Sequence, residues 1–152
     1  MESDHPHILT LSPPLDMQAK WFARSTAYTM AKYGMSMCVL GMAAEFKKKG
    51  IGINALWPMT IIATAAIQNN FGEAMMQQSR TPEIMADAAL EVLTRSPQEN
   101  TGNFFIDELV LKQAGIDDFS GYAYAAGQNQ FIADMFIPDE ILAQSSANLI
   151  TI

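Results

Sequence analysis

The sequence predicts an α/β fold in which strands and helices alternate and the strands pair in parallel. A short apolar run, residues 7–11, is followed by a long helical pattern over about residues 25–49. A second apolar run, residues 51–56, begins after a single glycine. A strand, a helix and a strand joined by such a short link are typical of a sheet built through right-handed crossovers.

The first elements have clear boundaries. The run His7–Leu11 is rich in residues that favour strands, and Pro13 and Pro14 end it because proline cannot donate a hydrogen bond to a ladder. Ser25 or Thr26 can cap the start of the helix. Three lysines followed by Gly50 are typical of a helix end.

The helix interior is apolar on most of its faces, so we expect it to be buried against more than one layer. Cys38 lies in this interior and is expected to be a buried small hydrophobic residue.

The later part of the chain predicts a weaker alternation of helices and strands. Thr81 as an N-cap, Pro82 at the first helical position and Glu83 in the first turn predict a clean helix start. The expected order is a buried strand at 51–56, a loop at 58–64, a weak helix at 65–79, a helix to about residue 94, a strand at 104–107, an irregular stretch at 117–130, a short element at 131–137 and one or two helical turns after Pro138.

Composition narrows the class of protein. The chain has 152 residues, 49% of them hydrophobic and 16% charged, which suits one globular core. Its net charge of −7 argues against nucleic acid as a partner. A lone cysteine fits a reducing compartment. With no signal-peptide pattern and no apolar run of membrane-spanning length, we expect a cytoplasmic protein with no membrane partner.

Tyr28 and Lys32 form the most informative pair in the sequence. They lie four residues apart in the long helix, so both project from one face with Cβ atoms about 5–6 Å apart. A free tyrosine has a pKa of about 10, and lowering it by about three units takes roughly 4 kcal/mol. One cation at about 4 Å supplies a term of that size at an effective dielectric constant near 20. Lys32 therefore suits Tyr28 for proton transfer.

Each of these residues also has an ordinary structural interpretation. A tyrosine four residues before a lysine is common by chance, and a tyrosine beside a lysine that extends to the surface explains the pair adequately. Ser12 alone is most often a strand-end or turn residue. The value of the pattern is its order: a strand with Ser12, a helix with Tyr-x-x-x-Lys, then a strand with Asn-x-x-x-Pro.

In this order the residues resemble the C-terminal half of the short-chain dehydrogenase/reductase family, and within it the hydroxysteroid dehydrogenase-like 2 subgroup. The segments that carry the resemblance are His5–Pro14, Ala27–Met37, Asn54–Pro58 and Thr101–Phe104. The resemblance covers most of residues 5–125. It implies a partial Rossmann-like fold, a doubly wound parallel sheet that lacks its N-terminal strands, in residues 1–130, with residues 131–152 as a C-terminal tail.

The resemblance also implies roles for individual residues. Tyr28 is the general acid/base, Lys32 lowers its pKa and binds the nicotinamide ribose, and Ser12 orients the substrate. The implied cofactor is NADP or NAD, with no metal, and Met59 stands where the family has a glycine. The residues implied to contact the cofactor are Tyr28, Lys32, Pro58, Thr60, Ile61 and Thr64.

Two hypotheses for function follow. The chain is either the catalytic half of an NAD(P)-dependent oxidoreductase that interconverts a small-molecule carbonyl and an alcohol, or a non-catalytic remnant that acts only as a folded or oligomeric protein. The sequence contains no glycine-rich phosphate loop, so binding of the cofactor by this chain alone is doubtful. We further expect a homo-oligomer, because an open strand edge and an apolar helix face favour self-association. Candidate residues for that face are Met30, Met37, Val39 and Phe46.

Overall fold

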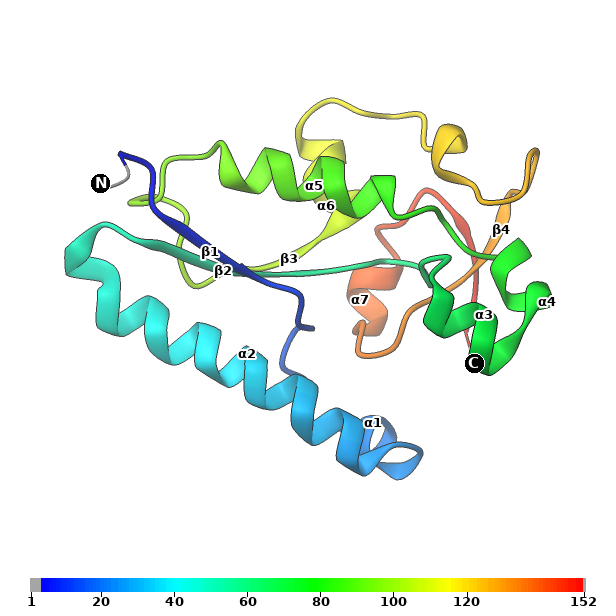
Figure 1. Cartoon of the computed structure of the whole chain (residues 1–152), viewed down its shortest axis with the longest axis horizontal. Coiled ribbons are helices and arrows are strands. Elements are labelled where there is room, and N and C mark those ends of the chain that lie inside the picture. The colour runs from blue at the N-terminus through cyan, green and yellow to red at the C-terminus, as the bar shows by residue number, and fades with distance from the viewer. Residues whose placement is uncertain (1–3, 152) are drawn as a thin grey trace. The chain divides into compact units, whose positions relative to one another are not determined.

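The computed structural model describes residues 4–151 and has the predicted α/β class (Figure 1). The chain divides into two compact units, one formed by residues up to Trp57 with Ala89–Phe105, the other by Pro58–Ala88 with the residues from Ile106 on. The elements are β1 (His7–Thr10), α1 (Lys20–Ala23), α2 (Thr26–Phe46), β2 (Gly52–Trp57), α3 (Ala65–Phe71), α4 (Glu73–Gln77), α5 (Glu83–Leu93), β3 (Phe104–Ile106), α6 (Asp107–Gln113), β4 (Gln130–Ile132), α7 (Asp139–Leu142) and β5 (Asn148–Ile150).

The principal sheet has the strand order β1-β2-β3, and β1 and β2 run parallel, as predicted. Their register pairs His7 with Gly52 and Thr10 with Ala55. All six residues of β2 are buried, which agrees with its continuous apolar sequence. A second, two-stranded parallel sheet is formed by β4 and β5. The sequence pattern did not predict β5 or α6.

Helix α2 has close to its predicted length and packs along β2 and β1 (Figure 1). It starts at Thr26, although the Ser25 side chain makes no capping hydrogen bond. The helix ends at Phe46 and is followed by a 3₁₀ turn of three lysines. Gly50 stops this turn in the left-handed conformation, with φ of 69°, which is the role expected of a glycine there.

The expectation that α2 is buried against more than one layer is wrong. One face of the helix is buried, made of Thr29, Tyr33, Ser36, Val39 and Ala43, and the apolar residues elsewhere on it are largely exposed. Cys38 is exposed, so its expected burial is also wrong. Val39 is fully buried and therefore cannot belong to an exposed apolar face.

The buried face of α2 was hard to recognise because three of its five side chains carry a hydroxyl group. Each hydroxyl is buried with a partner on the segment between β1 and α2. Tyr33 donates to the Asp16 carbonyl at 2.6 Å, and Ser36 donates to the Pro13 carbonyl at 2.7 Å. Thr29 donates to the Trp21 carbonyl at 2.5 Å. Polar residues can therefore form the packed face, which hydrophobicity alone does not indicate.

The core of the first unit joins α2 to β2. Val39 and Ala43 pack against Ile53 and Ala55, with Phe104 of β3 at the edge of the cluster. The Asn54 side chain donates to the Asn100 carbonyl at 2.8 Å and accepts the Asn103 N–H at 3.0 Å. These bonds attach β2 to the turn that precedes β3.

The second unit contains two short helices where the sequence predicted one. Gly72 separates α3 from α4 with φ of 79°, and its N–H donates to the Ile67 and Gln68 carbonyls. A glycine in this conformation ends a helix, so the expected continuous helix over residues 65–79 is interrupted. Helix α5 begins at Glu83 after Thr81 and Pro82, as predicted. Within residues 4–151, no helix is both long enough and apolar enough to cross a membrane.

Candidate active site

Tyr28 and Lys32 lie one turn apart near the start of α2, within the first unit. The Lys32 Nζ atom is 5.9 Å from the centroid of the Tyr28 ring. Tyr28 is 47% exposed, so its ring is accessible to a ligand. Because both residues project from the same helix face, this approach needs no ordered loop.

Lys32 also contacts the ends of two strands. Its ammonium donates to the Leu11 carbonyl at 3.3 Å, just beyond the last residue of β1. It lies 5.2 Å from the ring centroid of Trp57, the last residue of β2. The carboxyl ends of neighbouring parallel strands therefore meet at Lys32. In open α/β sheets this edge is where ligands bind.

Ser12 directly follows the carbonyl that Lys32 contacts. The Ser12 side chain is fully buried, and its Oγ has no hydrogen-bond partner among the described residues. Its N–H donates to the Thr10 carbonyl at 3.0 Å, which turns the chain at the end of β1. Buried hydroxyls without a partner are uncommon, and each one is a reason to look for a functional role. The structure thus places Leu11, the residue before Ser12, in contact with Lys32.

The loop that follows β2 belongs to the second unit, where it is held by backbone and carboxylate hydrogen bonds. The Met59 N–H donates to Asp107 Oδ1 at 2.8 Å, and the Met59 carbonyl accepts the Asp134 N–H at 3.1 Å. The Ile61 N–H donates to the Ile132 carbonyl at 2.9 Å. Among the described non-glycine residues, only Phe136 has a positive φ. Met59 therefore has no left-handed backbone strain.

The two threonines of this loop differ. Thr64 is the N-cap of α3, where its Oγ1 accepts the Ile67 N–H at 3.4 Å. Thr60 is fully buried, and its Oγ1 has no hydrogen-bond partner among the described residues. Thr60 is therefore the loop residue with an unused polar group, whereas Thr64 already has a structural function.

These residues can be compared with what a nicotinamide nucleotide requires. An ammonium has three N–H groups, and Lys32 donates one of them to Leu11, so it can also serve ribose hydroxyls. The accessible Tyr28 suits the reactive end of such a cofactor. In the part of the chain that the structure describes, no group of three or more His, Cys, Asp or Glu side chains could hold a metal ion.

A second polar cluster, which no local sequence pattern predicted, lies in the second unit around Arg80 and Glu108. Both side chains are buried, and Arg80 Nη1 lies 2.7 Å from Glu108 Oε2. Lys112 Nζ lies 2.9 Å from Glu108 Oε1, and the Ser146 N–H donates to the same oxygen at 2.6 Å. The available signal was a pair of carboxylates, Asp107 and Glu108, just after the end of β3, and it becomes meaningful only once Arg80 is brought beside Glu108.

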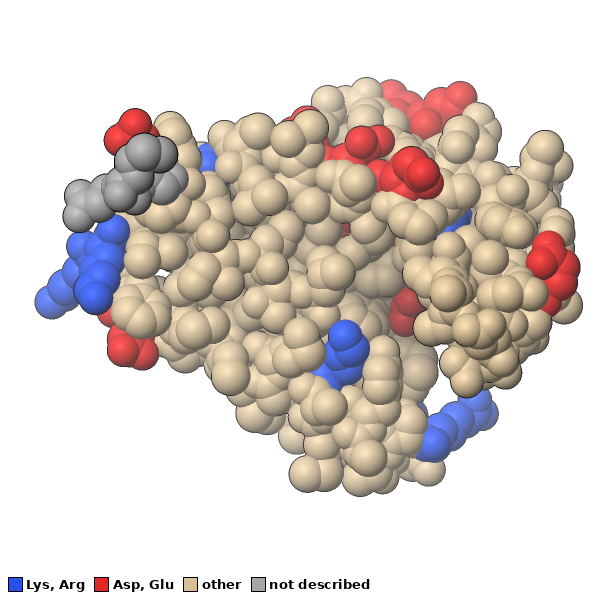
Figure 2. All heavy atoms as spheres, in the orientation of Figure 1, with Lys and Arg blue, Asp and Glu red and all other residues tan. Residues whose placement is uncertain are grey.

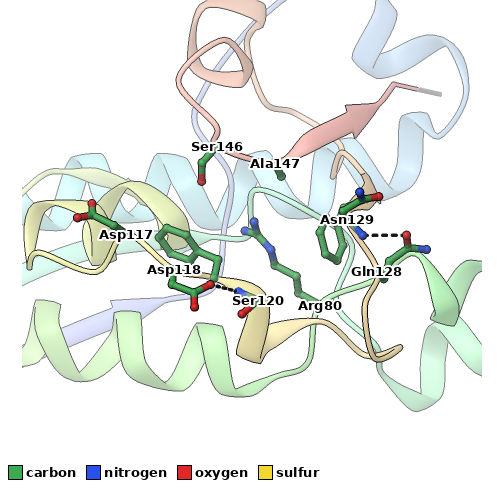
Figure 3. A pocket seen from close by; sticks show the side chains of 10 residues that line it. Arg80, Asp117, Asp118, Ser120, Gln128, Asn129, Ser146 and Ala147 are labelled. Carbon is green, nitrogen blue, oxygen red and sulfur yellow. Dashed lines mark hydrogen bonds between the residues drawn. The ribbon is translucent and has the colours of Figure 1, made fainter.

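Arg80 also borders a cavity of about 250 Å³ in the second unit (Figure 3). Its guanidinium points towards the segment that carries Ser146 and Ala147. The rings of Phe119 and Phe131 lie 5.3 and 5.1 Å from the guanidinium carbon. Aromatic rings, a carboxylate and the C-terminal segment therefore enclose this charge, which indicates a role in holding the unit together.

Two adjacent carboxyl groups in this unit have opposite pKa shifts. Burial alone would raise the pKa of Glu108, but the Ser146 N–H, Arg80 and Lys112 outweigh it and lower that pKa to about 2. Burial raises the pKa of Asp107 to about 6, against the N–H groups of Met59 and Glu108 and the charge of Arg80. Asp107 Oδ2 has no hydrogen-bond partner among the described residues.

The Asp107 shift predicts that this residue lowers stability as the pH rises. The folded state holds the Asp107 proton more tightly than the unfolded state, whose pKa is near 3.8. The free energy of unfolding should therefore fall by about 3 kcal/mol between about pH 4 and pH 6 and change no further above that. Urea unfolding at pH 5 and pH 7 covers the upper part of this range and should show a decrease of about 1 kcal/mol in the wild type and a smaller one in Asp107→Asn.

The comparison isolates Asp107 for two reasons. The ionised Glu108 carboxyl raises the free energy of unfolding. This contribution is lost only as the pH falls from about 4.5 towards 2, below the range from pH 5 to pH 7 used in the comparison. Asparagine keeps an oxygen that can accept the Met59 N–H. Equal pH dependence in the two proteins would contradict the prediction.

Comparison with known proteins gives consistent matches, although no family model matches the chain. Hydroxysteroid dehydrogenase-like protein 2 from Danio rerio is 48% identical over 151 residues, covering 97% of this chain and 36% of the relative. The human protein of that name is 49% identical over 133 residues, covering 86% of this chain and 31% of the relative. The chain thus spans about a third of the length of these curated relatives.

Solved structures show the same relationship. A Xanthomonas campestris protein proposed to be a dehydrogenase is 48% identical with a TM-score of 0.81, covering 91% of this chain and 50% of that protein. A short-chain dehydrogenase from Mycobacterium thermoresistibile is 43% identical with a TM-score of 0.82, covering 95% and 51%. A proposed NAD(P)-dependent gluconate 5-dehydrogenase from Beutenbergia cavernae, with NADP bound at low occupancy, is 23% identical with a TM-score of 0.53 and shows the fold alone.

In sequence and in fold, the described residues therefore correspond to the C-terminal half of a short-chain dehydrogenase/reductase. Within that family the chain is similar to the hydroxysteroid dehydrogenase-like 2 proteins, with about half of the aligned residues identical. Both statements agree with the resemblance seen in the sequence.

Proposed function

We propose that this chain supplies the catalytic half of an NAD(P)-dependent oxidoreductase that interconverts a carbonyl and an alcohol in a small molecule. The observation that carries the proposal is the position of Lys32, whose ammonium lies against Tyr28 and against the carbonyl next to Ser12. These are the three residue types that the proposed carbonyl reduction uses, and Lys32 contacts the ends of β1 and β2. The dehydrogenase relatives support the same class of reaction.

In this proposal the chain's own residues move and stabilise the proton. The Tyr28 phenol donates its proton to the substrate oxygen in reduction and removes it in oxidation. The Lys32 ammonium favours the phenolate that forms, and the Ser12 hydroxyl donates a hydrogen bond to the substrate oxygen. The nicotinamide, when bound, supplies or accepts the hydride at the substrate carbon.

The proposed cofactor is NADP or NAD. In the first unit the proposed contacts are Tyr28 and Lys32, and in the second unit they are Pro58, Thr60, Ile61 and Thr64. Thr60 has the unused hydroxyl in this loop, so it is a stronger candidate for a side-chain contact than Thr64. The chain has no glycine-rich turn to bind the pyrophosphate, and that part of the site must come from another segment.

A chimaeric protein made of two halves, called the two-half protein below, tests the proposal. The matching half of the Xanthomonas campestris protein is replaced by this chain, so that the other half supplies the missing strands. We expect turnover with NADPH or NADH, followed by the change in absorbance of the nicotinamide, on at least one member of a panel of ketones and aldehydes. The parent Xanthomonas campestris protein, assayed on the same panel, is the control for a competent cofactor site.

The chain alone is the second control. Calorimetric titration with NADPH or NADH should show weak binding or none, because the pyrophosphate site is missing. Tight binding by the chain alone would contradict this account of the cofactor site. If the two-half protein folds and binds cofactor but reduces no compound that its parent reduces, a non-catalytic remnant becomes the better explanation.

We also propose that the chain self-associates through the exposed face of α2. Met30, Met37 and Leu40 are 65%, 51% and 53% exposed, and their spacing places them along one side of the helix. The surface over α2 carries few charged side chains between the ends of the helix (Figure 2). Light scattering at micromolar concentration should give a mass above 16.7 kDa, and Met37→Glu should lower it towards that value.

The matched control for self-association is Leu90→Glu. Leu90 is 61% exposed but lies on α5, so a charge there should leave the mass unchanged. A wild-type mass of 16.7 kDa would contradict the proposal.

A further inference from the structure

Trp57 is the aromatic residue that faces Lys32 from the sheet. It is the last residue of β2 and is 5% exposed, so packing holds its ring in place. The Lys32 Nζ atom lies 5.2 Å from the centroid of this ring and 5.9 Å from that of Tyr28. The ammonium thus lies near both rings while it donates to the Leu11 carbonyl at 3.3 Å.

A lysine needs such contacts to remain in one place. Its side chain has four rotatable bonds, and fixing it costs rotamer entropy that the hydrogen bond to Leu11 only partly offsets. A cation over an aromatic ring is attracted to it, and tryptophan is the best aromatic partner for a cation. The contact with Trp57 therefore helps to decide whether Lys32 stays beside Tyr28.

Two further lysine–aromatic contacts among the described residues are local. Lys20 lies 4.6 Å from the ring of its neighbour Trp21, and Lys49 lies 5.1 Å from the ring of Phe46. The contact between Lys32 and Trp57 joins residues that are distant in sequence, one on α2 and one on β2. It exists only because α2 packs on the sheet, so the fold itself holds the ammonium in place.

We propose that Trp57 is a positioning residue that holds the Lys32 ammonium beside Tyr28. Its catalytic consequence rests on the proposed function: with Lys32 held, the Tyr28 proton exchanges at a lower pH. Without the indole ring, the ammonium would spend more of its time in solvent and favour the phenolate less. A loss of about 0.5–1 kcal/mol corresponds to a rise of about half a pH unit in the tyrosine-dependent limb of the rate profile.

The first test uses the chain itself and needs no activity. Protons above an aromatic ring resonate upfield, so the ε-methylene signal of Lys32 should be shifted upfield in the wild type. Trp57→Leu should return it to the position of a solvent-exposed lysine, and Trp57→Phe should keep part of the shift. The matched control is Trp21→Leu, which removes the other lysine–tryptophan contact and should leave the Lys32 signal unchanged. An unshifted wild-type Lys32 signal, or one unchanged by Trp57→Leu, would overturn the proposal.

Because Trp57 is buried, Trp57→Leu could fail to fold, and a second variant tests the proposal without replacing Trp57. Lys32→Met removes the ammonium and leaves the indole ring in place. In a Trp21→Phe background Trp57 is the only tryptophan, so its fluorescence reports directly on the loss of the charge. We expect a change in emission intensity or wavelength. Unchanged emission would overturn the proposal even if Trp57→Leu fails to fold.

The catalytic consequence is tested in the two-half protein. Trp57→Leu should shift the tyrosine-dependent limb of the pH–rate profile to higher pH by about half a unit. Trp57→Phe should return the limb most of the way to its wild-type position. A Trp57→Leu profile identical to that of the wild type would mean that Trp57 supports only the fold. An inactive wild-type two-half protein would count against the proposed function, and the Lys32 signal and the Trp57 emission would still decide whether Trp57 holds Lys32.

Discussion

Replacing Tyr28 with phenylalanine should lower kcat of the two-half protein by about 10²- to 10⁴-fold, the range typical of a lost general acid/base. The change removes one oxygen atom from an exposed side chain, so the fold should be unaffected. The ring over which Lys32 lies is retained, which leaves the ammonium in place. Initial rates with NADPH or NADH, measured beside the circular dichroism spectrum, check the prediction.

Tyr124→Phe is the matched control for this loss. Tyr124 is 41% exposed, similar to Tyr28, but lies in the second unit outside the candidate site. Its removal should change kcat by less than about twofold. If Tyr28→Phe behaved like Tyr124→Phe, Tyr28 would not be the proton donor.

Glu108→Gln should produce the largest loss of stability, about 3–5 kcal/mol. Glutamine keeps the shape of the side chain but leaves the buried Arg80 charge without its carboxylate, and it also removes the carboxylate that pairs with Lys112. The midpoint of thermal unfolding should fall by roughly 6–20 °C for a chain of this size. Urea unfolding at pH 7 gives the corresponding free energy.

Two controls separate the buried charge from other effects. Glu140→Gln makes the same chemical change at an exposed position and should alter stability by less than about 0.5 kcal/mol. Combining Arg80→Met with Glu108→Met removes both charges and should recover part of the loss, because no buried charge then remains unpaired in the pair. A Glu108→Gln protein as stable as the wild type would show that the ion pair contributes nothing.

Much of the first unit could be predicted because its signals are local. Three lysines and Gly50 mark the end of α2, and an apolar run after one glycine marks β2. The spacing of Tyr28 and Lys32 places them on one helix face whatever surrounds the helix. The second unit was harder, since α6 starts directly after β3 and β5 is only three residues long.

The sequence by itself determined the α/β class, the positions of β1, α2 and β2, and the candidate residues Ser12, Tyr28 and Lys32. Helix periodicity and turn chemistry depend on neighbouring residues, which the sequence contains. Only the tertiary structure decided which face of α2 is buried, because its hydroxyl groups find carbonyl partners on another segment. It also decided that Trp57 lies over Lys32 and that Arg80 pairs with Glu108. Such contacts join residues far apart in the chain, and no local pattern specifies them.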